Sequence, residues 1–458
     1  MAETPAYDLY RLRPEDIEEP PKTFGKIFRR VGPGLILAGS IVGSGELIAT
    51  TVLGAENGYT LLWLILLSCV IKVAVQNELG RYSIGTGETP LEAFDKVPGP
   101  RWRVSWVVWA WFFMIMMTLM QIGAMLGGIA EILTDMAPGV PVNVWVWLLA
   151  LATAVMLILG QYRFVELISL ALVVSFTILT VSCAALMFKL PDYFSWASLL
   201  DGLAFHLPKG GFLTAVAAFG ITGVGANELI MYPYWCIEKG YARYTGRRDD
   251  SAAWRRRAEG WIKVMGVDVL NCMVIYTFAT IAFYLLGGGV LHGMGVVPRG
   301  ADMIKLLSRM YTETLGSWSL YLFLVGAFAV LYSTLFSSTA ANARCMADLA
   351  GMLGIYNRRD YTKRLLATRI CVASILTIPA VYFMFVKEPV LMVKIGGVAQ
   401  AAMLPVIGFC TVYLRYRHLP KAIVPKGWLT LALWVSASIM AVMMGYSLAF
   451  SLLQWLWR

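Results

Sequence analysis

The stretch GSIVGSGELIATT, residues 39–51, places three glycines and one carboxylate inside an apolar segment. Each glycine in a helix interior costs about 1 kcal/mol relative to alanine, so Gly39, Gly43 and Gly45 weaken a helix at this point. A carboxylate at the centre of a bilayer costs about 3 kcal/mol or more, and irregular backbone is tolerated there only against protein or a watery cavity. The stretch therefore predicts a broken membrane-spanning helix, with Glu46 at a binding site.

The rest of the chain has the composition of an integral membrane protein. Of its 458 residues, 59% are hydrophobic and 14% are charged, whereas a soluble protein carries about 25% charged residues. Windows of about 19 residues predict eleven apolar spans, each long enough to cross about 30 Å of hydrocarbon. The predicted spans are 31–54, 60–80, 104–134, 143–161, 164–188, 212–236, 264–290, 318–341, 370–386, 389–414 and 428–456.

The distribution of basic residues predicts the orientation of these spans. With a cytoplasmic N-terminus, the inside segments hold 29 of the 38 Lys and Arg residues and the outside segments hold 7. The positive-inside rule then places the N-terminus in the cytoplasm, and the odd number of spans places the C-terminus outside. We expect the basic loop RRDDSAAWRRR (247–257) to touch anionic lipid headgroups and not nucleic acid. The stretch DMIKLLSRMYTETL (302–315) predicts an amphipathic helix in an external loop.

A second span repeats the opening pattern 182 residues later in the sequence. The stretch GITGVGANELI (220–230) again combines three glycines with one acid, and residues 42–48 match residues 224–230 at five of seven positions. The two spans are the first and the sixth. In transporters built from two inverted five-helix repeats, these are the broken helices, and substrate binds between them. The repeat therefore predicts one cavity shared by Glu46 and Glu228.

Two other interpretations of the repeat remain open. The match can arise by chance between two apolar helices of biased composition. Alternatively, each glutamate pairs with Lys72, Lys394 or an arginine and serves only the structure.

The sequence does not point to an enzyme. Its seven cysteines are scattered singly, and we find no pairing of a nucleophile with a base, no Cys/His metal cluster and no phosphate-binding loop. The stretch GTGE (85–88) lacks the lysine that a phosphate-binding loop requires. We therefore expect no enzymatic activity and no cofactor.

Three stretches resemble the Nramp family of divalent-metal transporters. They are GPGLILAGSIVGSGELIATTVLGAENGYTLLWLILLS (32–68), ELGRYSIGTGETPLEAF (78–94) and PKGGFLTAVAAFGITGVGANELIMY (208–232). The resemblance implies an all-α membrane protein with a LeuT-type fold, in which two inverted repeats of five helices have discontinuous first and sixth spans and an eleventh helix follows.

The same resemblance implies a division of the chain and a multi-pass protein of a bacterial inner membrane. We expect a cytoplasmic tail over 1–30, a first five-helix repeat over 31–188, an external loop over 189–211, a second five-helix repeat over 212–414, and a linker with an eleventh transmembrane helix over 415–458.

This sequence departs from the family at the metal signatures. The positions of the first-span pattern DPGN hold Gly43, Ser44, Gly45 and Glu46. Those of the sixth-span pattern MPHN hold Val224, Gly225, Ala226 and Asn227. The family's third-span acidic pair falls on Gln121 and Ala124, so with Ala226 we expect no proton passage along that route. In the tenth span the family's glutamine falls at Gly397, and Gln400 lies one turn on.

The loss of a thioether and an imidazole favours a site made of oxygen ligands, which suits Mg²⁺, Ca²⁺ or Mn²⁺. We expect Glu46 to be the charged metal ligand, with Asn227 and Glu228 assisting, and backbone carbonyls at the two breaks completing the shell. The predicted substrate-binding residues are Gly43, Ser44, Gly45, Glu46, Val224, Gly225, Asn227, Glu228, Ser40, Thr222 and Gln400.

The sequence thus predicts a secondary transporter that moves a hard divalent cation, such as Mg²⁺ or Mn²⁺, across the lipid bilayer by alternating access. One copy of the chain is sufficient for this function, and the oligomeric state stays open. One alternative is a transporter on the same scaffold for a small organic solute or a monovalent ion, with the metal site lost. Another is a sensor or scaffold that transports nothing.

Overall fold

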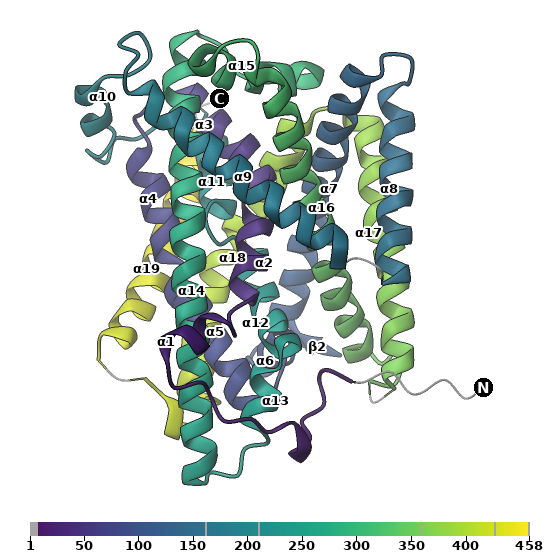
Figure 1. The fold of residues 1–458 in the computed structure, drawn as a ribbon. Coiled ribbons are helices and arrows are strands. Elements are labelled where there is room, and N and C mark those ends of the chain that lie inside the picture. The colour runs from purple at the N-terminus through teal and green to yellow at the C-terminus, as the bar shows by residue number, and fades with distance from the viewer. Residues whose placement is uncertain (1–7, 161–162, 209–210, 359, 426, 457–458) are drawn as a thin grey trace.

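The computed structural model describes residues 8–160, 163–208, 211–358, 360–425 and 427–456. Parts of the predicted tail (1–7), of the predicted external loop (209–210) and of the last predicted helix (457–458) lie outside the described residues. The described chain is helical apart from a hairpin of two-residue strands, β1 (Arg101–Trp102) and β2 (Val104–Ser105) (Figure 1). The all-α prediction is therefore confirmed.

Within the described residues, ten helical segments are long and apolar enough to cross a membrane. Three of the ten are interrupted: the first, with α2 (Pro33–Ile41), η2 (Ser44–Thr50) and α3 (Thr51–Asn57); the second, with α4 (Leu62–Ile71) and α5 (Val73–Thr86); and the fifth, which is the predicted sixth span, with α11 (Phe212–Ile221) and α12 (Ala226–Lys239). The others are α7 (Trp106–Met136), α8 (Val142–Leu159), α14 (Ala252–Leu286) with η3 (Gly287–Leu291), α16 (Ser319–Met352), α17 (Tyr361–Val386), α18 (Pro389–Arg417) and α19 (Trp428–Leu456). The helix α9 (Arg163–Met187) occupies the place of the predicted fifth span.

Short helices gather at the two ends of this bundle (Figure 1). One end, called here the α6 end, carries α1 (Phe24–Phe28), α6 (Pro90–Phe94) and α13 (Tyr241–Thr245). The opposite end, called the α10 end, carries α10 (Trp196–Asp201) and α15 (Met303–Leu315). The helix α15 confirms the amphipathic helix predicted between the seventh and eighth spans. The 3₁₀ turn η1 (Pro14–Asp16) lies in the N-terminal segment, η5 (Lys421–Ile423) lies between α18 and α19, and η4 (Gly300–Asp302) precedes α15.

Two helices start well before the apolar windows that predicted them. The helix α14 starts at Ala252, so the second half of the predicted basic loop 247–257 is helical, and α17 starts at Tyr361 instead of residue 370. A hydropathy window detects only the apolar part of such helices. Their true starts are marked by capping, because the Ser251 hydroxyl accepts a hydrogen bond from the Trp254 amide and the Asp360 carboxylate accepts one from the Lys363 amide.

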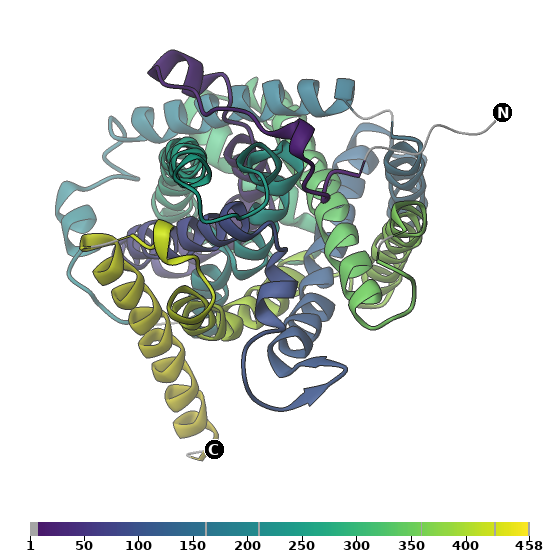
Figure 2. The ribbon, with the colours of Figure 1, turned by 90° about the horizontal axis from the view of Figure 1, so that it is seen from below.

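The broken helices lie at the centre of the bundle. In the apolar windows of the first and sixth spans 89% and 83% of residues are buried, against 22% in those of α8 and α19. Seen from the α6 end, α19 and the α8–α17 pair lie at the periphery, while the N-terminal segment crosses this face (Figure 2). The backbones approach closely at the centre, since a Cβ on Gly220 of α11 would lie 2.7 Å from the Ala401 nitrogen of α18. The first and sixth spans thus face protein on nearly all sides.

Candidate substrate site between the broken helices

The first break lies at the glycines that the sequence singled out. Val42 and Gly43 leave helical geometry after α2, and the chain re-enters a π-helical stretch at Ser44. A Cβ on Gly43 would lie 2.6 Å from the Cβ of Thr334 in α16, so the helices approach too closely here for any larger residue. π-helical turns are frequent at functional sites because they leave backbone groups free to bond elsewhere. The predicted discontinuity of the first span is confirmed.

The second break also interrupts a helix at glycines, but its backbone conformation differs from that of the first. The helix α11 ends at Ile221, Thr222 is extended, and Gly223 has a φ of +68°, a conformation that favours glycine. The helix α12 then starts at Ala226 with Gly225 as its N-cap. The predicted discontinuity of the sixth span is also confirmed, and both breaks are buried at the centre of the bundle.

A small cavity lies between the two breaks and the helices α7 and α16. Measured for the centre of a water molecule its volume is about 20 Å³, which holds about one water or ion. Nine oxygen-bearing side chains line it, together with the thioether of Met125 and three isoleucines. The nine are Ser40, Ser44, Thr118, Gln121, Asn227, Glu228, Thr334, Ser338 and Asn342.

Some of these polar groups bond to one another. The side-chain oxygen of Gln400 accepts a hydrogen bond from the backbone N–H of Asn227 at 3.0 Å, and the Gln400 side-chain nitrogen donates to Gln121 Oε1 at 3.3 Å. The hydroxyls of Ser40 and Ser338 lie 3.2 Å apart. Gln400 therefore connects the start of α12 to α7 behind the cavity.

Three buried acceptors at the cavity have no hydrogen-bond partner among the described residues. They are Glu228 Oε2, Asn227 Oδ1 and Asn342 Oδ1. A buried acceptor without a partner costs about 1–3 kcal/mol, and more if it is charged. A bound cation or donor group would remove that cost, so the cavity has the character of a binding site.

Glu46 does not line this cavity. Its side chain is fully buried, and its Oε1 accepts hydrogen bonds from the Gly223 amide at 3.3 Å and from the Thr280 hydroxyl of α14 at 3.0 Å. The Thr50 and Thr222 hydroxyls, 3.1 Å apart, form a second link between the two breaks. In this conformation Glu46 joins the broken helices to each other and to α14.

The structure thus divides the predicted site residues into two groups. Ser40, Ser44, Gly45, Asn227 and Glu228 line the cavity, as does Gln121 from the former proton-path positions. The remainder lie outside its lining: Gly43, Glu46, Thr222, Val224, Gly225, Gln400, Ala124 and Ala226.

Sequence reasoning missed the contribution of α16. Thr334, Ser338 and Asn342 lie at helical spacing on one face of this helix and all line the cavity. The signal was present as STLFSSTAANA (333–343), a run of small and hydroxyl residues inside an apolar span. Such residues mark helix contacts in membranes. Thr118 and Met125 on α7 carried no comparable signal.

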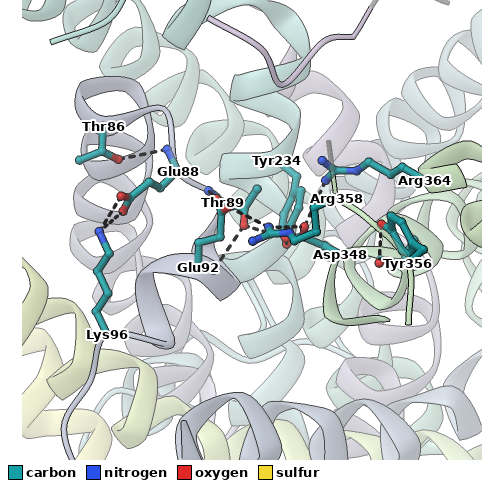
Figure 3. Close-up of polar contacts among 11 residues, drawn as sticks. Thr86, Glu88, Thr89, Glu92, Lys96, Tyr234, Asp348, Tyr356, Arg358 and Arg364 are labelled. Carbon is teal, nitrogen blue, oxygen red and sulfur yellow. Dashed lines mark hydrogen bonds and ion pairs between the residues drawn. The ribbon is translucent and has the colours of Figure 1, made fainter. Parts of the chain in front are cut away.

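Ionic contacts close the bundle at the α6 end. The buried carboxylate of Asp348 in α16 accepts hydrogen bonds from the Thr89 and Tyr234 hydroxyls, both at 2.7 Å (Figure 3). It also accepts from Arg358 at 2.8 Å and from Arg364 at 3.4 Å. Burial alone would lower the pKa of Arg358, but the charges of Asp348 and then Glu92 raise it above its ordinary value. The arrangement ties α12, α16, α17 and the start of α6 together.

An ion pair joins α18 to α3 at the α10 end. Lys394 of α18 donates to Glu56 Oε1 of α3 at 2.9 Å, and the side chains are 18% and 12% exposed. Lys394 therefore pairs with neither Glu46 nor Glu228, which removes one of the alternative partners considered for those acids.

Comparison with known proteins agrees with this architecture. The sequence profile described as natural resistance-associated macrophage protein-like, Nramp, matches residues 34–450. The chain belongs to the Nramp family. It is 24% identical over 399 residues to an uncharacterized protein of Pasteurella multocida, covering 86% of each chain. It is also 23% identical over 457 residues to the divalent metal cation transporter MntH of Listeria monocytogenes, covering 94% of this chain and 92% of that protein.

Solved structures show the fold of this Nramp member. The Eremococcus coleocola manganese transporter, in complex with an aromatic bis-isothiourea compound, superimposes with a TM-score of 0.61 at 18% identity, covering 94% of this chain and 90% of that one. MhsT in complex with L-phenylalanine superimposes with a TM-score of 0.55 at 15% identity, covering 94% and 99%. The fold is of the LeuT type, as predicted, and family and fold are those of transporters.

Proposed function

We propose that this Nramp member carries a hard divalent cation, such as Mg²⁺ or Mn²⁺, across the membrane by alternating access. The cavity between the broken helices is its binding site, with Glu228 as the charged ligand. We propose that a single copy of the chain supplies the site.

The observation that carries the proposal is the set of unpartnered buried oxygens at the cavity. Glu228 Oε2, Asn227 Oδ1 and Asn342 Oδ1 come from two helices and lack hydrogen-bond partners within the described chain. Carboxylate and amide oxygens are the ligands that Mg²⁺, Ca²⁺ and Mn²⁺ prefer. The cavity volume of about 20 Å³ fits one ion and not an organic solute of several heavy atoms in this conformation. The names of relatives such as the divalent metal cation transporter MntH are consistent with this cargo.

The position of the cavity between two closed ends supports alternating access. The contacts of Asp348 lie on the side of α6, and the Lys394–Glu56 pair lies on the side of α10. We propose that the α6 end faces the cytoplasm of a bacterial inner membrane and that each end opens in turn. Ala124 and Ala226 have no titratable side chain, so we propose transport without a proton relay through the third span.

The experiment compares the glutamates of the two broken helices in purified protein reconstituted into liposomes. Uptake of Mg²⁺, Mn²⁺ and Ca²⁺ is measured for the wild type, Glu228→Gln and Glu46→Gln. A charged ligand is worth about 1.5–3 kcal/mol, so Glu228→Gln should lower the affinity for the ion about 10- to 100-fold. Glu46→Gln should change the affinity less, because Glu46 lies outside the cavity lining and its Oε1 accepts hydrogen bonds from Gly223 and Thr280. Wild-type protein that moves none of the three ions would refute the proposal.

The Met125 thioether provides a matched test of ion class. Sulfur ligands favour soft metals, so Met125→Leu should leave Mg²⁺ uptake unchanged and reduce any uptake of Cd²⁺. A large loss of Mg²⁺ uptake in this variant would contradict a site made of oxygen ligands.

A neutral polar solute is the second candidate cargo. Of the nine oxygen-bearing side chains at the cavity, Glu228 is the only charged one, and among the described residues no cluster of three or more His, Cys, Asp or Glu residues is placed to hold a metal. Hydroxyls and amides suit hydrogen bonds to a small organic molecule in an expanded cavity. Thermal stabilisation by such solutes, with no response to divalent cations, would favour this candidate.

A further inference from the structure

A buried lysine of the second span binds the carbonyl end of α11, which is the first half of the sixth span. Lys72 lies at the junction of α4 and α5 and is fully buried. Its ammonium donates hydrogen bonds to the carbonyl oxygens of Phe219 and Thr222, both at 2.7 Å. These are carbonyls of the last turn of α11, where four carbonyls have no partner within the helix.

Lys72 is held by this helix end and not by an acid. The ion pairs found among the described residues do not include it. Its ammonium also lies 5.3 Å from the centre of the Phe219 ring, and it interacts electrostatically with Glu46 and Glu228 at longer range. The C-terminus of a helix carries about half a negative charge. The main partner of the lysine is therefore the carbonyl end of α11.

The place that Lys72 fills has the features of a monovalent cation site. Ser68 contributes a hydroxyl that donates to the same two carbonyls, at 3.3 and 3.0 Å. The backbone packs closely around it, because a Cβ on Gly223 would lie 3.0 Å from the Cα of Cys69. In transporters with broken helices, the carbonyl ends of half-helices hold the coupling Na⁺ or H⁺. Without the lysine, two carbonyl oxygens and one hydroxyl would surround an ammonium-sized space.

We propose that the Lys72 ammonium is a built-in cation that occupies the position which the carbonyl end of α11 would otherwise offer to a coupling Na⁺, so that this transporter works without Na⁺. The proposal does not depend on which substrate fills the cavity, because the Lys72 position is not part of the cavity lining. It assigns to Lys72 a positioning role: the lysine stabilises the break at Thr222 and Gly223 that presents Asn227 and Glu228.

The test removes the built-in cation and offers a free one. Thermal unfolding of purified wild type, Lys72→Ala and Lys72→Gln is measured in NaCl and in choline chloride at equal ionic strength, together with binding of radioactive Na⁺. The wild type should unfold at the same temperature in both salts and bind no Na⁺. Both variants should unfold at a lower temperature in choline, and Na⁺ should raise it by a few degrees in a saturable manner.

Lys394→Ala is the matched control, since it also removes one lysine from a span but leaves the end of α11 intact. It should show no difference between Na⁺ and choline. In liposomes, uptake of the divalent cation by Lys72→Ala should be about tenfold higher in Na⁺ than in choline. This factor applies when the Na⁺ concentration is about ten times the dissociation constant for Na⁺.

A Na⁺ response of the wild type, or the absence of one from both Lys72 variants, overturns the proposal. Because unfolding and Na⁺ binding are measured without substrate, this result stays separate from the outcome for divalent cations.

Discussion

The two ends of the bundle are closed by contacts of unequal strength. At the α6 end one buried carboxylate, Asp348, accepts hydrogen bonds from four side chains in four segments (Figure 3). At the α10 end one partly exposed ion pair joins Glu56 to Lys394. Removing one partner of a buried ionic network costs more than removing one partner of an exposed pair. We therefore expect the α10 end to open more easily than the α6 end.

The N-terminal segment adds to this inequality. The Tyr10 hydroxyl donates to Glu238 of α12 at 2.6 Å, and the guanidinium of Arg364 lies 3.6 Å from the centre of the Tyr10 ring. Glu238 also pairs with Arg344 of α16 at 3.0 Å. The chain before the first span thus holds the same helices as Asp348, and opening this end requires the segment to move.

The largest effect is expected at Asp348. The change Asp348→Ala leaves Arg364 and two buried hydroxyls without their shared acceptor, so the free energy of unfolding should fall by about 3–5 kcal/mol. Thermal unfolding in detergent measures this loss. Asp348→Asn is the control, because it keeps an acceptor and removes only the charge, and it should cost less. Equal stability of Asp348→Ala and wild type would remove the difference between the two ends.

The pair at the α10 end should contribute less. Lys394→Met or Glu56→Gln should each cost about 1–2 kcal/mol, between the values for exposed and buried pairs. A double-mutant cycle isolates the interaction between the two side chains, since additive losses would show that they do not stabilise each other. A cost larger than that of Asp348→Ala would reverse the comparison.

The Tyr10 hydroxyl should have a smaller effect. Tyr10→Phe keeps the ring beside Arg364 and removes one hydrogen bond to a charged acceptor, which is worth about 1.5 kcal/mol or less in this partly buried position. Tyr10→Ala also removes the cation–π contact and should cost about 1 kcal/mol more. If both variants match the wild type in thermal unfolding, the N-terminal segment does not hold the α6 end.

The smallest expected effect is a pH dependence from His418, which follows α18. Burial and then the charge of Lys96 lower the pKa of this imidazole in the folded protein. The neutral form is therefore favoured by folding, and stability should decline as the pH falls below about 6.5, the ordinary pKa of histidine. Unfolding temperatures of wild type and His418→Asn, compared between pH 7.5 and 5.5, measure this decline. An equal decline in both proteins would assign it to other groups.

Much of the architecture followed from local patterns. Glycines that weaken a helix next to an acid predicted both breaks, because the cost of a glycine and of a buried charge depends little on the rest of the fold. Hydropathy located the spans but not the starts of α14 and α17, since their first turns are polar and begin at the caps Ser251 and Asp360.

The composition of the cavity was less accessible. The matching positions of Glu46 and Glu228 suggested one shared site, yet Glu228 lines the cavity and Glu46 bonds to Gly223 and Thr280. The two breaks have different backbones, so equivalent positions in the sequence repeat point in different directions. The partner of Lys72 could not be predicted either, because every residue has a backbone carbonyl and the sequence does not show which carbonyls a lysine will bind.

The sequence by itself determined the class of this protein: a membrane-spanning helical bundle of the Nramp family with two glycine-weakened spans that each carry an acid. Solvation decides those features, because lipid favours apolar spans and penalises interrupted helices and unpaired acids, and a single segment is enough to reveal each effect. Only the tertiary structure decided which acid faces the cavity, which helix end Lys72 binds and which four side chains donate hydrogen bonds to Asp348. Those choices depend on the distances between side chains that lie far apart in the sequence, and no local pattern specifies them.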